Sequence, residues 1–163
     1  MKKGELYIIA HNIRSAHNVG AIFRTADGAG VARIYLTGYT PEPAAQGKTE
    51  EEKTKAEKML GKTALGAETS VPWERMNNLD ELLLSLKKQG VRVVALEKTA
   101  SSISMHTLAL HFPMALILGN EVEGVNEDVL ARCDAVMDIP MRGTKESLNV
   151  SVAAGIAMYK ILG

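Results

Sequence analysis

Met114-Ala-Leu-Ile-Leu118 is an apolar run that breaks into the polar turn Gly119-Asn-Glu-Val-Glu-Gly124. A second run, Ala135-Val-Met-Asp-Ile139, stops at Pro140 and leads into a polar stretch over 140–147. Short, mainly apolar runs bounded by Gly or Pro predict strands of a parallel sheet that is covered on both faces. Because open parallel sheets bind ligands beyond the carboxyl ends of their strands, the two polar segments predict one shared site.

The last run, Ser147-Leu-Asn-Val-Ser-Val-Ala-Ala-Gly-Ile-Ala-Met-Tyr159, is too long for a strand and predicts a helix that continues to Leu162. Ser147 is the expected N-cap of this helix, because serine hydroxyls accept from the free amides of a first turn. Its small residues indicate that another element packs closely against it. Apolar residues occupy more than one of its faces, which exceeds what a single core requires and predicts a homodimer.

The rest of the chain alternates short strand patterns with amphipathic helical patterns. This order predicts one α/β domain over 1–163, a mostly parallel sheet flanked by helices. The expected strands cover 6–10, 33–37 and 91–96, with a short extended piece at 70–74. The expected helices run from Asn18 to about Gly28 and from Asn78 to Gly90.

Residues 39–72 are the least regular part of the sequence. Mixed charges there favour a solvated, partly helical segment. The alternative is an RNA-contacting loop that uses its lysines, although four acidic residues in the same run argue against it; these lysines are Lys48, Lys53, Lys55, Lys58 and Lys62.

Composition narrows the function classes. Lys plus Arg and Asp plus Glu balance at 19 each in 163 residues, so an RNA-binding function would require a local basic patch.

The single cysteine, Cys133, excludes an internal disulfide and a multi-thiolate zinc site, and a half-buried thiol is its expected state. The four histidines have no metal-binding spacing, so no metal is expected. No apolar run approaches the ~20 residues of a membrane helix, and the start lacks a signal-peptide pattern, so the expected location is cytoplasmic.

Three segments together resemble the motifs of the SpoU (TrmH-type) RNA 2′-O-methyltransferases of the SPOUT superfamily. They are Asn18-Val-Gly-Ala-Ile-Phe-Arg24, Leu116–Val125 and Ile139–Ala153. The resemblance implies methyl transfer from S-adenosylmethionine, with S-adenosylhomocysteine as product, to a ribose 2′-hydroxyl of transfer or ribosomal RNA. It also implies a deep trefoil knot near the C-terminus, a homodimer, and a minimal catalytic domain with no added RNA-binding extension.

The resemblance further implies the site residues. The expected cofactor pocket comprises Leu96, Gly119, Asn120, Gly124, Ile139, Met141, Ser147 and Leu148. The expected catalytic set comprises Asn18, Arg24, Glu121, Ser147 and Asn149, with the arginine handling the target ribose and its phosphate. In such a dimer, the arginine of one subunit can approach the cofactor of the other.

Each of these residues also has a structural interpretation. Ser147 could serve only as a helix cap, and Asn149 could only hydrogen-bond a neighbouring loop. Glu121 could only favour the positive end of a helix that begins at about Asn126. From pattern alone, Arg24 would be a surface cation in a weak salt bridge.

Two other function classes stay open at this point. A nicotinamide-binding Rossmann enzyme would require Gly-x-Gly-x-x-Gly after the first strand, and that motif is absent. A non-catalytic RNA-binding or assembly protein on a methyltransferase scaffold would be expected to have lost parts of the motifs, and none is missing.

Overall fold

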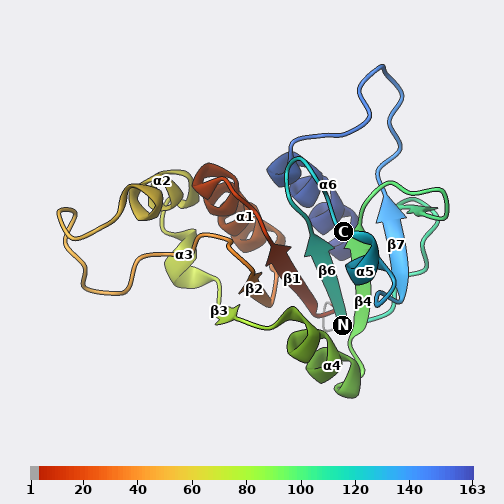
Figure 1. Ribbon diagram of the computed structural model, residues 1–163, viewed down its shortest axis with the longest axis horizontal. Helices are drawn as coiled ribbons and strands as arrows, with labels where there is room; N and C mark the ends of the chain where they lie inside the picture. Colours follow the sequence, from red (N-terminus) through yellow and green to blue (C-terminus); the bar gives the residue numbers. More distant parts are fainter. Residues whose placement is uncertain (1–3) are drawn as a thin grey trace.

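The computed structural model describes residues 4–163 as a seven-stranded sheet with helices on both faces (Figure 1). The strand order is β3-β2-β1-β6-β4-β7-β5, and each pairing between these strands is parallel. The predicted fold class is therefore confirmed, while the trefoil knot stays a prediction from the resemblance. The strands are β1 (Leu6–His11), β2 (Arg33–Thr37), β3 (Trp73–Met76), β4 (Arg92–Leu96), β5 (Ile103–Ser104), β6 (Met114–Leu118) and β7 (Ala135–Asp138).

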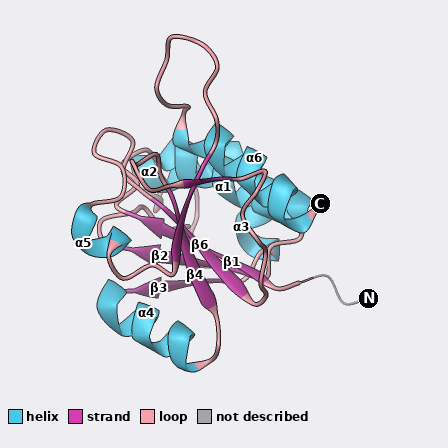
Figure 2. Cartoon of the chain, turned by 90° about the vertical axis from the view of Figure 1, so that its right-hand side faces the viewer, coloured by secondary structure: helices cyan, strands magenta, loops and turns pink. Residues whose placement is uncertain are grey.

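The helices form two layers, one on each face of the sheet, as Figure 2 shows for α4 on one side and α1 and α6 on the other. The first layer contains α1 (Ala16–Ala29), α2 (Lys55–Ala64), α3 (Ala67–Ser70) and α6 (Val150–Leu162). The second contains α4 (Leu79–Lys88) and α5 (Glu127–Leu130). No helix within residues 4–163 is long and apolar enough to cross a membrane.

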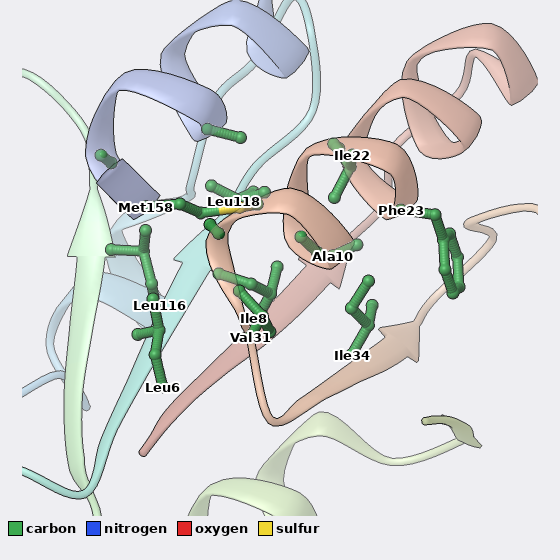
Figure 3. Close-up of a cluster of buried hydrophobic side chains, with 14 of the residues drawn as sticks. Leu6, Ile8, Ala10, Ile22, Phe23, Val31, Ile34, Leu116, Leu118 and Met158 are labelled. Carbon is green, nitrogen blue, oxygen red and sulfur yellow. The ribbon is translucent and has the colours of Figure 1, made fainter. Parts of the chain in front are cut away.

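Alternating strand residues supply the two halves of the core. Ile8 of β1 and Leu116 of β6 belong to the core cluster under α1 and α6, which also contains Phe23 and Met158 (Figure 3). Ile9, the residue after Ile8 in β1, points to the other face of the sheet and belongs to the cluster under α4. Every residue of β6 is buried, which explains why its sequence is apolar without alternation.

The helices of the first layer approach one another through small residues. A Cβ on Gly20 of α1 would lie 2.3 Å from the Leu60 carbonyl oxygen of α2. The Thr63 hydroxyl of α2 donates to the His17 carbonyl oxygen at 3.0 Å. A Cβ on Gly155 of α6 would touch a methyl group of α1 at 3.3 Å. Helices α2, α1 and α6 are thereby held as one packed layer.

Two helix starts differ from the sequence prediction. The first helix does not open at Asn18, because the Ser15 side chain accepts from the Asn18 amide and the helix begins at Ala16. Ser147 is not the cap of the last helix, because Asn149 accepts from the amides of the following residues.

Elsewhere the predicted organisation is confirmed or extended. The irregular segment contains α2, which a capping box between Thr54 and Glu57 begins. The extended piece near Trp73 is β3, and this side chain packs against the core as an anchor. The two-residue strand β5 had no periodic signal because it is defined only by pairing with Met137 and Asp138.

Candidate functional site

A cavity of about 680 Å³ opens at the carboxyl ends of β4, β6 and β7. Its walls come from the segment after β4, the turn after β6 and the loop between β7 and α6. Its lining includes every residue of the expected cofactor pocket: Leu96, Gly119, Asn120, Gly124, Ile139, Met141, Ser147 and Leu148. The two polar segments predicted to share one site therefore meet there.

The turn after β6 is organised by the buried side chain of Asn120. Its Oδ1 accepts from the backbone amides of Val122, at 2.8 Å, and Glu123, at 2.9 Å. Its Nδ2 donates to the Asn12 carbonyl oxygen at 3.1 Å and to the Tyr39 hydroxyl oxygen at 2.9 Å. Because the amide group has used both of its donors and accepts two bonds, it fixes the turn and ties it to the segments that follow β1 and β2.

Two glycines of this turn allow close backbone contacts. A Cβ on Gly119 would lie 2.4 Å from the Gly124 carbonyl carbon. Gly124 has a φ of 68°, and a Cβ there would lie 2.0 Å from a carboxylate oxygen of Glu97. That oxygen accepts from the Val125 amide at 3.0 Å. The absence of side chains at these two positions therefore lets the backbone of the turn pack closely on itself and on Glu97 at the wall of the cavity.

Residues from all three motifs form one hydrogen-bonded chain. The Asn149 Nδ2 donates to the Asn18 Oδ1 at 3.2 Å. The Asn18 Nδ2 in turn donates to a Glu121 carboxylate oxygen at 3.1 Å. Asn149 also caps α6, and its partner outside that helix is Asn18 of α1, not a loop. The network links the start of α1, the turn after β6 and the start of α6 at the rim of the cavity.

Glu121 does not interact with the helix near Asn126, and that structural interpretation is wrong. Its carboxylate accepts from the backbone amides of Arg14 and Ser15, each at 3.0 Å, immediately before α1. Burial raises its pKa, but these hydrogen bonds, with that from Asn18, outweigh burial and leave the pKa below the usual 4.5. The carboxylate is thus held ionised against free amides that precede the helix.

This arrangement predicts the pH dependence of stability. A lowered folded-state pKa stabilises the protein above the unfolded value, and this contribution is lost as the pH falls through the folded value. We expect Glu121→Gln to lower stability by about 1 kcal/mol at neutral pH, because its amide group would turn a donor toward a backbone donor. Melting curves of both proteins from about pH 7 to 2.5 should converge only as the pH falls below the usual 4.5 of the carboxyl group. A constant difference would contradict the assignment.

The other expected catalytic residues lie in different places. Arg24 is exposed on α1 and does not line the cavity of its own chain. Its side chain forms no ion pair within residues 4–163, so the surface salt-bridge interpretation is wrong for the part of the chain described. Ser147 lines the cavity but is exposed in the loop before α6. Asn18 reaches the site only through its hydrogen bonds to Glu121 and Asn149.

Sequence reasoning missed the acidic character of the cavity. Besides Glu121, its lining contains four carboxylates and a single cation, Lys98; the four are Glu97, Glu123, Asp138 and Glu146. The Ser102 hydroxyl donates to Asp138 at 2.5 Å. The signal available in the sequence was position, because Glu97 follows β4 directly and Asp138 ends β7.

Within residues 4–163, the geometry supports neither a reactive cysteine nor a metal site. Burial raises the pKa of the Cys133 thiol to about 11, so it is protonated at neutral pH and matches the expected half-buried thiol. Within residues 4–163, no three His, Cys, Asp or Glu side chains gather as a metal-binding group.

The sequence of this chain is similar to those of known methyltransferases. The SpoU rRNA Methylase family profile matches residues 5–159. A tRNA (guanosine(18)-2′-O)-methyltransferase of Aquifex aeolicus is 35% identical over 98% of the chain and 69% of its own length. A putative TrmH family tRNA/rRNA methyltransferase, YacO of Bacillus subtilis, is 32% identical over 95% of the chain and 57% of its own length.

A solved structure is similar over the same extent. The AdoMet-bound rRNA methyltransferase from Sinorhizobium meliloti superposes with a TM-score of 0.82 at 28% identity, over 98% of this chain and 56% of that one. The chain thus spans less than two thirds of the length of several proteins that it matches. Since the family match covers nearly the whole sequence, the chain belongs to the SpoU rRNA methylase family.

Proposed function

We propose that the protein methylates a ribose 2′-hydroxyl of transfer or ribosomal RNA in the cytoplasm, with S-adenosylmethionine as the methyl donor. The observation that carries the proposal is the convergence of the three motif segments around one cavity, joined by the Asn18–Glu121–Asn149 network. The named activities of the relatives from Aquifex aeolicus and Bacillus subtilis support the reaction class.

The residues present fit this donor. A cavity of about 680 Å³ falls within the usual range of ligand pockets, roughly 300–1,000 Å³. S-adenosylmethionine has two positive centres, a sulfonium and an ammonium, and the cavity lining is rich in carboxylates. The adenosine portion requires flat apolar walls and backbone hydrogen bonds. Leu96, Ile139 and Leu148 would supply the apolar walls, and the turn at 119–124 would supply backbone groups.

When bound, the donor supplies an electrophilic methyl group on its sulfonium sulfur. The chain's own residues must then bring the ribose oxygen into line and accept or pass on its proton. Asn149 and Glu121 hold the starts of α6 and α1 in fixed positions at the rim. Arg24 would contact the target phosphate and stabilise negative charge that develops on the ribose oxygen.

Calorimetry tests the donor. We expect S-adenosylmethionine or S-adenosylhomocysteine to bind the folded protein at micromolar to submillimolar concentration, because the cavity and its glycine-lined wall are already formed. Absence of binding up to about 1 mM, with a normal melting curve, would contradict catalysis and favour a non-catalytic RNA-binding scaffold. Tighter binding of a nicotinamide dinucleotide would favour the Rossmann alternative.

Within the same proposal the protein acts as a homodimer through α6 and the adjoining face of α1. Three apolar side chains of α6 are spaced at i, i+4 and i+7 and point outward: Val152 is 51% exposed, Ile156 37% and Tyr159 57%. Exposing such an apolar stripe to water costs free energy in a monomer. Because α6 packs beside α1, the helix that carries Arg24, we expect a second copy of this chain to cover the stripe. Pairing there would bring Arg24 toward the partner's cavity.

Light scattering tests the dimer. The wild type should have twice the 17.6 kDa mass of the chain at micromolar concentration. Ile156→Glu should yield a monomer, because a charge would be buried in an apolar interface. Leu84→Glu is the matched control, since Leu84 is 61% exposed on α4, on the other face of the sheet. A monomeric wild type, or dissociation by both substitutions, would contradict the proposal.

A further inference from the structure

Helix α2 presents three lysines on one exposed face. Lys55, Lys58 and Lys62 are exposed and spaced at i, i+3 and i+7, which aligns them along the helix. The opposite side of the helix buries Leu60 and Ala64. Within residues 4–163 none of the three lysines forms an ion pair. We call this surface the α2 lysine face.

Three of the acidic residues around α2 bond to groups other than the three lysines, while Glu51 and Glu68 form no ion pair within residues 4–163. Glu57, the only acid within the helix, receives two 3.0 Å hydrogen bonds from Lys48 and also accepts from the Thr54 amide. In the preceding turn, the Glu50 carboxylate pairs with Lys53, and Glu52 accepts from a backbone amide. None of these three carboxylates pairs with a lysine of the α2 lysine face.

Lys58 is the lysine of this face whose charge acts on the paired carboxylate of Glu50. The pKa of Glu50 is lowered first by the hydrogen bond from Lys53, and more weakly by the charge of Lys58. Lys62 lies at the other end of α2 and is next to Thr63, whose hydroxyl donates to α1. Because Thr63 holds this end of α2 against α1, we expect Lys62 to contribute most to binding RNA next to the site.

The α2 lysine face is rigidly placed with respect to the candidate site. Gly20 lets α2 approach the backbone of α1, and Thr63 is bonded to the His17 carbonyl oxygen at 3.0 Å. The next residue, Asn18, belongs to the network at the cavity rim. Figure 1 shows α2 beside α1, on the side away from α6. Arg14, His17 and Arg24, on or before α1, are also exposed.

We propose that the α2 lysine face binds the phosphodiester backbone of the RNA substrate next to the nucleotide that enters the site. A chain with no net charge can bind a polyanion only through such a local patch. Lysine ammonium groups contact phosphates without reading bases, so this surface would position the RNA and leave target selection to the cavity. The inference rests on the proposed function, because it takes RNA as the substrate.

The experiment measures binding of fluorescently labelled unfractionated transfer RNA over a series of salt concentrations. In the triple variant Lys55→Gln, Lys58→Gln and Lys62→Gln, the helix keeps good helix-forming residues and loses its charge. Loss of three phosphate contacts should reduce the slope of log K against log salt by about 2 to 3 and raise the Kd at least about 10-fold near 0.1 M salt. The triple Lys→Arg variant should bind like the wild type.

A matched pair of single variants tests whether RNA binding depends on the position of the lysine or only on the total charge of the protein. Lys62→Gln should weaken binding more than Lys88→Gln, which removes an exposed lysine of α4 on the other face of the sheet. Equal losses in the two variants would overturn the proposal. So would an unchanged Kd and salt slope in the triple variant, or a wild type that binds no transfer RNA.

Two further measurements distinguish failure of the proposed methylation from failure of the α2 lysine face. Melting curves and S-adenosylmethionine calorimetry on the same variants report folding and the cavity, which the lysines do not line. A triple variant that melts normally and binds S-adenosylmethionine normally, but loses RNA affinity, supports the α2 lysine face. Absence of S-adenosylmethionine binding in every protein, with lysine-dependent RNA binding intact, would reject methylation while retaining the RNA surface.

Discussion

Arg24→Ala is expected to abolish methylation while leaving the fold intact. The guanidinium can hold a phosphate through two parallel hydrogen bonds and stabilise charge on the reacting oxygen, and removing one such contact typically costs on the order of 10²-fold or more in rate. Arg24→Lys keeps the charge but loses the planar fork, so little activity should remain. Single-turnover methylation of bulk transfer RNA and of ribosomal RNA measures the effect.

The stability of the Arg24 variants distinguishes chemistry from folding. Arg24 is exposed and lies outside its own chain's cavity, so melting temperature and S-adenosylmethionine affinity should stay close to wild type. Arg33→Ala is the matched control, because its side chain is 41% exposed in a surface ion pair with Glu74. It should cost no more than ~1 kcal/mol and leave turnover near normal. Normal turnover in Arg24→Ala would remove this residue from the site.

Gly119→Ala should impair both cofactor binding and stability. The added Cβ would lie 2.4 to 2.6 Å from three backbone atoms of Gly124 and Val125, which cannot rotate away as a side chain could. The turn would have to open, and its paired hydrogen bonds between Asn120 and Gly124 would be lost. We expect destabilisation of about 1–3 kcal/mol. Cofactor affinity should fall at least about 10-fold, as calorimetry would measure.

Gly61→Ala is the control for adding a methyl group to a glycine. Gly61 lies inside α2, and the nearest heavy atom to its added Cβ would be a Glu68 carboxylate oxygen at an ordinary 3.6 Å. Alanine should stabilise this helix by about 0.5–1 kcal/mol. Unchanged cofactor affinity in Gly119→Ala would show that the turn tolerates opening and does not form the binding wall.

Local patterns were sufficient to predict most elements. The run at 114–118 is a fully buried strand, and the amphipathic pattern after Asn78 is the helix α4, which buries Leu82, Leu83 and Leu86. Such predictions succeed because side-chain burial follows the period of a single element. The start of α4 could also be predicted from local sequence, since Asn78 accepts from the Glu81 amide within one turn.

Helix starts failed where several polar residues competed. Ser15, Asn18, Ser147 and Asn149 can all cap a helix by residue type, and only two of them do. Asn18 instead donates to Glu121, and Ser147 lies in an exposed loop. The choice depends on where the rest of the fold directs the chain.

The sequence by itself determined the α/β class, the strands that end at the cavity and, through resemblance, the residues that line it. Only the tertiary structure decided what Glu121 does, because its partners at Arg14 and Ser15 lie 107 and 106 positions away. The same holds for Asn149, which meets Asn18 across 131 positions. No local period encodes such contacts. They form because parallel strands bring the ends of distant segments to one edge of the sheet, where unpaired amides and carboxylates satisfy one another.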